Sequence, residues 1–222
     1  MSTSPKIAVI LSGCGFQDGS EIHEAVCALL ALDQQGAQYQ CFAPDVPQAR
    51  VMNHLKGEEA NETRNVLVES ARIARGNIQP LSALDTAQFD ALVMPGGFGA
   101  ALNLSDFAKA GAQCTVQPDV EKAVKAMHAA GKPIGALCIA PVILARLLPG
   151  TRLTIGSDAD TASACTAMGA EHQNTDHGEI AVDAKNRIVT TPCYMLEARI
   201  SQIYDGAQAL VKELLKMVRE AK

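Results

Sequence analysis

Short apolar runs alternate with longer stretches of helical periodicity along most of this 222-residue chain, and this alternation restricts the fold more than any other feature. It is typical of a parallel sheet with helices packed on both faces. Strands are predicted at Lys6–Leu11, Tyr39–Ala43, Ile78–Leu81, Ala91–Met94, Pro133–Leu137 and Leu153–Ile155. Helices are predicted at Ser20–Gln35, Glu62–Arg75 (capped by Asn61), Val120–Ala130, Ile143–Leu148 and Ile200–Arg219, and a hairpin at Glu179–Val182 and Arg187–Thr190. The predicted fold is therefore α/β with a mostly parallel sheet, in a single domain that spans residues 1–222.

The composition excludes several other classes of protein. Apolar residues make up 48% of the chain, which is enough to form a core and argues against disorder. Acidic residues outnumber basic residues by 24 to 19 and tryptophan is absent, so the chain lacks the basic surface and the stacking platforms of a nucleic-acid-binding protein. No apolar stretch approaches the roughly 18 residues of a membrane span. Neither nucleic acid nor a membrane is an expected partner.

The cysteine usage and the apolar run near the first residues predict a location. Seven cysteines form an odd set without a CxxC pair, which favours reduced thiols over a disulfide framework. The apolar run at residues 7–11 is too short for the hydrophobic region of a secretory signal peptide. These features predict a cytoplasmic protein.

One cysteine stands between a predicted strand and a predicted helix. Cys138 directly follows the strand Pro133–Leu137, and a sharp strand-to-helix turn of this kind is a nucleophile elbow. Such an elbow exposes the side chain at the end of the sheet and points the next backbone N–H at a developing oxyanion. The helix N-terminus beside the thiol also favours the thiolate. The alternative is a buried cysteine that packs as a small apolar residue.

Two further segments are expected at the same edge of the sheet, because the carboxyl ends of parallel strands meet there. The turn Pro95–Gly99 follows another strand, and its amides can supply a second oxyanion donor, although an ordinary turn is the alternative. Glu21 and Glu24 share one face of the first helix, whereas His23 points elsewhere. A carboxyl group in an apolar site can hold a proton and donate it to a thiolate. The alternative is that both acids only complement the helix N-terminus.

Other motifs give weaker signals. The loop Gly13–Gly15 after the first strand resembles a dinucleotide-binding fingerprint, but Asp18 occupies the place of the third glycine, and Asp45 is the candidate ribose ligand. A nucleotide-binding module is therefore one alternative function. His172 and His177 lie five residues apart without further ligands at metal-site spacing, so a surface loop is expected there and no metal.

The order of these motifs along the chain resembles the ThiJ/PfpI superfamily, and more closely its ElbB branch of enhancing lycopene biosynthesis proteins. The resemblance extends from residue 6 to residue 218. The matching segments are Ile10-Leu-Ser-Gly-Cys-Gly15, Asp18-Gly-Ser-Glu-Ile-His-Glu24, Asn53-His-Leu55, Glu62-Thr-Arg-Asn65, Pro95-Gly-Gly-Phe-Gly-Ala100, Gly135-Ala-Leu-Cys-Ile-Ala-Pro141, Leu153-Thr-Ile-Gly156, Thr190-Thr-Pro192 and Tyr194-Met195. The resemblance implies a flavodoxin-like three-layer α/β sandwich that usually forms a homodimer.

The resemblance also implies roles for four residues. Cys138 matches the elbow nucleophile, and Glu24 matches the carboxylic acid beside it. The backbone N–H groups of Gly97 and Ile139 match the oxyanion donors. Proteins of this branch are described as glyoxalases that convert glyoxal to glycolate without glutathione, cofactor or metal, an activity that can instead reflect deglycation of protein adducts. The implied partner is thus a small dicarbonyl substrate.

Two departures from related enzymes narrow the function. Peptidase-like and some glyoxalase-like relatives carry histidine directly after the nucleophile, but this chain has Ile139, which argues against a Cys–His peptidase and leaves the general base unassigned. Class I glutamine amidotransferases use a later His-x-Glu pair, but His177-Gly-Glu179 lies in a predicted hairpin and Ala140 replaces the usual elbow glycine. The principal alternative is a non-enzymatic redox sensor or chaperone in which Cys138 is oxidised to a sulfinic acid.

Overall fold

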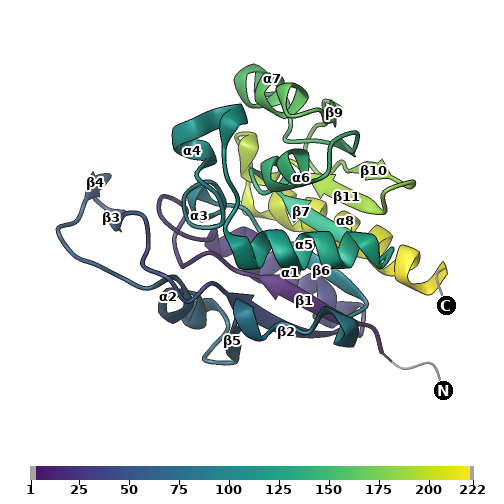
Figure 1. Ribbon diagram of the computed structural model, residues 1–222, viewed down its shortest axis with the longest axis horizontal. Coiled ribbons are helices and arrows are strands. Elements are labelled where there is room, and N and C mark those ends of the chain that lie inside the picture. The colour runs from purple at the N-terminus through teal and green to yellow at the C-terminus, as the bar shows by residue number, and fades with distance from the viewer. Residues whose placement is uncertain (1–3, 221–222) are drawn as a thin grey trace.

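The computed structural model describes residues 4–220, and at the centre of these residues lies a seven-stranded sheet (Figure 1). The strand order is β10-β11-β7-β6-β1-β2-β5, and every neighbouring pair is parallel except β10 with β11. The strands are β1 (Lys6–Ile10), β2 (Gln38–Ala43), β5 (Ile78–Pro80), β6 (Ala91–Met94), β7 (Ile134–Leu137), β10 (Ala181–Asp183) and β11 (Ile188–Thr191). The predicted mostly parallel sheet is confirmed, and the predicted hairpin supplies its antiparallel edge.

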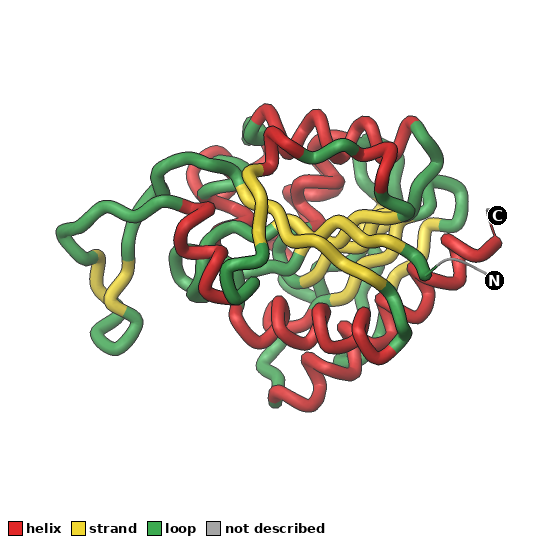
Figure 2. Tube along the Cα trace, turned by 90° about the horizontal axis from the view of Figure 1, so that it is seen from below, coloured by secondary structure: helices red, strands yellow, loops and turns green. Residues whose placement is uncertain are grey.

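Helices cover both faces of this sheet, which forms the middle of three layers (Figure 2). Successive side chains of a strand point to opposite faces, so Ile7 and Val9 pack with one layer of helices, and Ala8 and Ile10 pack with the other. The first layer contains α1 (Ile22–Gln34), α2 (Val66–Ile73) and α8 (Ile200–Glu220), and the second contains α3 (Phe98–Leu102), α5 (Pro118–Ala129) and α6 (Pro141–Leu147). The predicted α/β sandwich is therefore confirmed.

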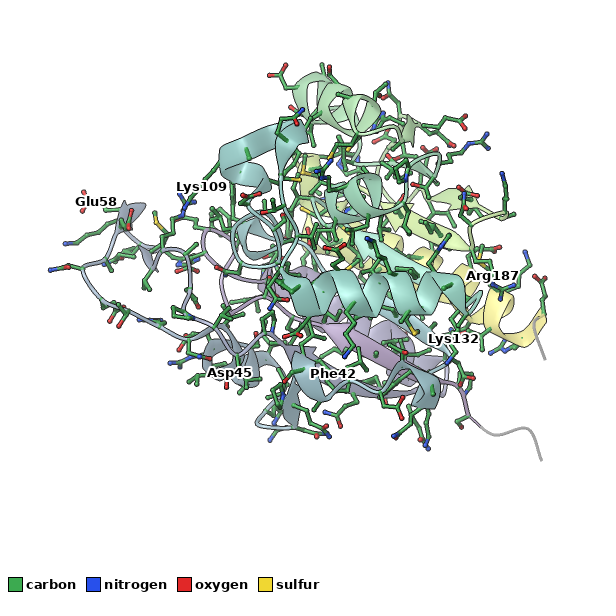
Figure 3. All side chains as sticks on the ribbon, viewed as in Figure 1. Phe42, Asp45, Glu58, Lys109, Lys132 and Arg187 are labelled. Carbon is green, nitrogen blue, oxygen red and sulfur yellow. The ribbon has the colours of Figure 1, made fainter. Side chains whose placement is uncertain are left out.

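A two-stranded arm projects from the body of the molecule (Figures 1 and 2). It contains β3 (Met52–Asn53) and β4 (Glu58–Glu59), which pair antiparallel, and Glu58 lies near its far end (Figure 3). The backbone N–H of Met52 donates to the Asp18 carboxylate at 2.7 Å, which ties the arm to the loop after β1. The imidazole of His54 packs edge-on against the ring of Phe16, with 5.5 Å between the ring centroids.

Several elements differ from the sequence-based predictions. The second helix begins at Val66 rather than Glu62, because Asn65 caps it by accepting the Val68 N–H at 3.0 Å. The strand predicted at Leu153–Ile155 is β8 (Arg152–Leu153), which pairs with β9 (Glu171–His172) outside the main sheet. The remaining short elements were not predicted: α4 (Phe107–Ala110), α7 (Ala159–Ala167), η1 (Leu81–Ala83), η2 (Thr86–Gln88), η3 (Gly111–Gln113) and η4 (Cys193–Met195).

Within residues 4–220, no helix combines the length and the apolar character that crossing a membrane requires.

Candidate active site

Cys138 occupies a sharp turn between β7 and α6. Its backbone has φ of 59°, in the left-handed region that non-glycine residues seldom adopt. The Cys138 N–H donates to the carbonyl of Thr191 at 2.9 Å, which continues the pairing of β7 with β11 for one residue past the strand end. Helix α6 then begins at Pro141, a residue suited to a first helical turn. This strand–turn–helix geometry is that of a nucleophile elbow.

Glu24 lies in the first turn of α1 and is fully buried. Its carboxylate accepts the backbone N–H of Gly96 at 3.0 Å and the backbone N–H of Tyr194 at 3.2 Å. The Cys138 thiol lies within hydrogen-bonding reach of the same carboxyl group. Burial, reinforced by the nearby charge of Glu21, raises the pKa of Glu24 to about 8, although the three hydrogen bonds oppose the shift. Glu24 therefore carries a proton at neutral pH.

The thiol of Cys138 responds to the same surroundings. Burial and the Glu24 carboxylate raise the pKa of Cys138, whereas backbone N–H groups of Gly97 and Ile139 lower it. The sequence led us to expect a thiol pKa below the ordinary value, and burial acts in the opposite direction. A Cys138 thiolate and an ionised Glu24 would repel each other at hydrogen-bonding distance. The thiolate is therefore more stable while Glu24 keeps its proton.

Two consecutive glycines allow this close approach. A Cβ on Gly96 would lie 2.4 Å from the Cβ of Cys138 and 2.9 Å from the carbonyl oxygen of Leu137, so a side chain has no room there. Gly97 has φ of 93°, and a Cβ on it would meet the Glu21 N–H nitrogen at 2.3 Å. The family resemblance implied that Gly97 is an amide donor, whereas the steric requirement at Gly96 was not predicted.

A cleft of about 330 Å³ opens beside the thiol. Cys138, Ile139 and Gly97 line it together with the rings of three phenylalanines, Phe16, Phe98 and Phe107. Its polar lining comes from Glu21, Asp158, Thr161 and Tyr194. Tyr194 lies in η4, and the sequence analysis gave it no chemical role. It contacts His23, whose Nδ1 lies 2.8 Å from the Tyr194 hydroxyl.

The structure does not bring the weaker candidate residues to Cys138. His177 contacts the Asp176 carboxylate and the Glu197 carbonyl, and the Glu179 carboxylate accepts the Asp176 N–H. Neither His177 nor Glu179 lines the cleft. Among residues 4–220 no three His, Cys, Asp or Glu side chains are grouped as metal ligands, and His172 instead accepts the Ile155 N–H at 3.3 Å.

The glycine-rich loop after β1 packs closely against other segments of the protein. A Cβ on Gly13 would lie 2.9 Å from the Cα of Gly19, and a Cβ on Gly15 would lie 2.6 Å from the imidazole of His54. Asp45 lies near α2 (Figure 3), where its carboxylate accepts the side-chain amide of Asn65 at 2.8 Å. These glycines allow close packing of the chain against itself, and we find no cradle for a phosphate there.

Comparison with known proteins gives a consistent result. A sequence model of the DJ-1/PfpI family matches residues 16–192. The human glutamine amidotransferase-like class 1 domain-containing protein 3, mitochondrial, is 49% identical over 96% of this chain and 83% of its own length. The rat mitochondrial ES1 protein homolog is 48% identical over 96% of this chain and 84% of its own length. An isoprenoid biosynthesis protein with an amidotransferase-like domain from Ehrlichia chaffeensis superposes with a TM-score of 0.89 at 37% identity, covering 95% of this chain and 99% of that one.

These relatives correct the predicted location. The sequence-based expectation of a cytoplasmic protein is wrong, since the human and rat relatives that match most of the chain are mitochondrial proteins. The expectation depended on cysteine usage and on the shortness of the apolar run at residues 7–11. Neither feature distinguishes the cytosol from another compartment inside the cell.

Proposed function

The chain belongs to the DJ-1/PfpI family, many of whose members are cysteine enzymes, and we propose that it converts small dicarbonyls without a cofactor, glyoxal to glycolate being the representative reaction. The resemblance to the ElbB branch and the similarity to the Ehrlichia chaffeensis protein support this assignment. Cys138 is the proposed nucleophile, Glu24 the proposed acid, and Gly97 and Ile139 the proposed oxyanion donors.

The observation that carries the proposal is the convergence of these groups on one sulfur. The N–H groups of Gly97 and Ile139 lie within hydrogen-bonding reach of the Cys138 sulfur, and so does the carboxyl group of Glu24. N–H groups fixed in a partly apolar cleft stabilise developing negative charge strongly, because they need not reorganise during the reaction. An aldehyde oxygen bound beside the sulfur becomes such a charge when the thiolate attacks.

The reaction balances without an external oxidant. The Cys138 thiolate forms a C–S bond to one aldehyde carbon of glyoxal, and the carbonyl electron pair moves to oxygen as an oxyanion. After protonation of the oxyanion, the C–H proton leaves the sulfur-bearing carbon, its electron pair forms a C=C bond, and the neighbouring carbonyl oxygen takes up a proton, which gives an enediol. The second carbon then takes up a proton while the oxygen on the first carbon loses one, so the first carbon is oxidised to a thioester and the second is reduced to an alcohol. Water attacks the thioester, the C–S bond breaks, and glycolate and the free thiol are released.

A second candidate function uses the same contacts. A protonated Glu24 and two N–H groups can also hydrogen-bond the oxygens of a Cys138 sulfinate, which would make the protein a redox sensor or chaperone. Such a protein consumes peroxide in proportion to its own thiol and turns over no dicarbonyl.

Turnover of glyoxal by matched variants tests the proposal. We expect the purified protein and its Cys14→Ala variant to form glycolate at similar rates, and the Cys138→Ala variant to form none above the uncatalysed rate. Cys14 is the matched control because it also follows a parallel strand at this edge of the sheet. Glycolate formation that survives in Cys138→Ala would contradict the proposal. No turnover, combined with stoichiometric oxidation of Cys138 by peroxide, would favour the redox function.

A further inference from the structure

Tyr194 connects the buried acid to a histidine through two different groups. Its backbone N–H donates to Glu24 at 3.2 Å, and its hydroxyl lies 2.8 Å from Nδ1 of His23. The two rings are tilted at 45° with their centroids 5.9 Å apart. His23 belongs to α1, one residue before Glu24, so the acid and the histidine leave the same helical turn in different directions.

Tyr194 lines two hollows on the surface. One is the cleft that contains Cys138, and the other has a volume of about 540 Å³ and contains His23; Phe16, Glu21 and Met195 also line both. His23 is exposed, whereas Tyr194 is half-buried. The side chains of Tyr194 and His23 therefore connect the cleft to an imidazole exposed to solvent.

The other polar groups that line the cleft are poorly suited to moving protons. Asp158 caps α7 by accepting the Thr161 N–H at 2.8 Å, and hydrogen bonds from Thr161 lower the pKa of its carboxyl group. Glu21 caps α1 by accepting the Glu24 N–H at 2.7 Å. No histidine, lysine or arginine among residues 4–220 lines the cleft. Burial, and the charges of Glu21 and Glu24, raise the pKa of Tyr194, so its hydroxyl keeps a proton to donate.

We propose that Tyr194 is a further catalytic residue that protonates the substrate oxyanion, and that His23 is a positioning residue that returns the proton to Tyr194 from solvent. This inference rests on the proposed reaction of Cys138 with a carbonyl carbon. As the C–S bond forms, the carbonyl electron pair becomes an oxyanion held by the N–H groups of Gly97 and Ile139. The Tyr194 O–H proton passes to that oxyanion, His23 Nδ1–H passes its proton to the tyrosinate, and solvent supplies a proton to Nε2.

Two reactions of Cys138, with an aldehyde and with iodoacetamide, distinguish a loss of proton transfer from a loss of access to the thiol. Addition to an aldehyde requires protonation of an oxyanion, whereas alkylation by iodoacetamide does not. We expect Tyr194→Phe to lower glyoxal turnover by about 10²- to 10⁴-fold, the usual contribution of acid–base catalysis, and to leave the alkylation rate of Cys138 within about twofold. His23→Gln keeps a hydrogen-bond partner for the hydroxyl but cannot relay a proton, and should lower turnover by about tenfold. Tyr204→Phe is the matched control because Tyr204 bonds Gln34 and Gln208, away from the cleft, and should change neither reaction.

The outcomes distinguish this inference from the proposed function. Equal losses in turnover and alkylation in Tyr194→Phe would show a purely structural role, and unchanged turnover would show no role, so either result overturns the inference. Normal turnover in His23→Gln would remove His23 from the path. Wild-type protein that alkylates at Cys138 but forms no glycolate would overturn the proposed function and the inference with it. Wild-type turnover that Tyr194→Phe retains would overturn the inference alone.

Discussion

Cys138 and Cys14 both follow parallel strands at the same edge of the sheet, yet the protein surrounds them differently. Cys138 is 6% exposed and faces a buried carboxyl group and two backbone N–H groups. Cys14 is half-buried, in a loop whose neighbouring charges are Glu69, Arg72, Asp18 and Arg64. Burial and Glu69 raise the pKa of Cys14, and Arg72 and Arg64 lower it. A position at a strand end is therefore not enough to make a cysteine a nucleophile. Fixed donors converging on the sulfur distinguish Cys138.

Closing the space beside Cys138 should cause the strongest loss among substitutions of residues that only position the thiol. Gly96→Ala would place a Cβ 2.4 Å from the Cys138 Cβ, so the elbow has to shift. We expect turnover of glyoxal to fall about 100-fold, since a displacement of about 1 Å is enough for such a loss. Overpacking should also lower the free energy of unfolding by about 1–3 kcal/mol. Alkylation of Cys14 is the internal reference and should be unchanged. Normal turnover in Gly96→Ala would show that the close contact is not needed.

The buried acid should make stability depend on pH. The folded-state pKa of Glu24 is raised from its ordinary 4.5 to about 8, so between these values the folded protein holds a proton that the unfolded chain releases. Raising the pH through this window therefore lowers the free energy of unfolding, by about 1.4 kcal/mol per pH unit. Between pH 5 and 7 the wild type should lose about 3 kcal/mol relative to Glu24→Gln, which cannot ionise. Urea unfolding at each pH measures the difference, and parallel curves for the two proteins would show that Glu24 is not held protonated.

The same acid should control how fast Cys138 is alkylated. Near pH 6 Glu24 keeps its proton and can donate a hydrogen bond to the thiolate, so Glu24→Leu should react about tenfold more slowly and Glu24→Gln at nearly the wild-type rate. Above pH 8 the ionised wild-type Glu24 repels the thiolate, so Glu24→Gln should then react faster than the wild type. Glu21→Leu leaves Glu24 in place and removes a charge that raises the pKa of Glu24, so near pH 6 it should react closer to the wild-type rate than Glu24→Leu does. A change in Glu21→Leu, with none in Glu24→Leu, would identify Glu21 as the acid instead.

The smallest expected effect concerns Cys14. Glu69→Gln removes a negative charge that raises the pKa of Cys14 and leaves the charges of Arg72 and Arg64 in place. Iodoacetamide should therefore alkylate Cys14 about threefold faster, a change typical of a partly screened charge, and Cys138 at an unchanged rate. If both cysteines change equally, the substitution has altered the fold rather than the local charge.

Short sequence patterns predicted the features that neighbouring residues determine, such as the strand ends and the face of a helix. The short apolar runs and the strand–turn–helix order placed Cys138 at the carboxyl ends of the strands, and the spacing of the first helix put Glu21 and Glu24 on one face. The choice of Glu24 as the acid came from the resemblance. In the structure, it is Glu24 that is fully buried against the thiol, whereas Glu21 caps the helix and lines the cleft.

The remaining features depend on long-range contacts. Asn61 and Asn65 both precede the second helix, and either could cap it by sequence alone. Only the structure shows that Asn65 is the cap and that the residues before it lead back from the arm formed by β3 and β4. Tyr194 lies in a single 3-10 turn without periodicity, and 171 residues separate it from its partner His23. The clash at Gly96 follows from the approach of β6 to the elbow after β7, which no local pattern encodes.

Peptide mapping after brief exposure to glyoxal shows which sulfur attacks the substrate. We expect the peptide with Cys138 to gain the mass of one glyoxal at early times, the peptide with Cys14 to stay unmodified, and Glu24→Leu to slow the gain. Early modification of Cys14 with Cys138 unmodified would contradict this expectation.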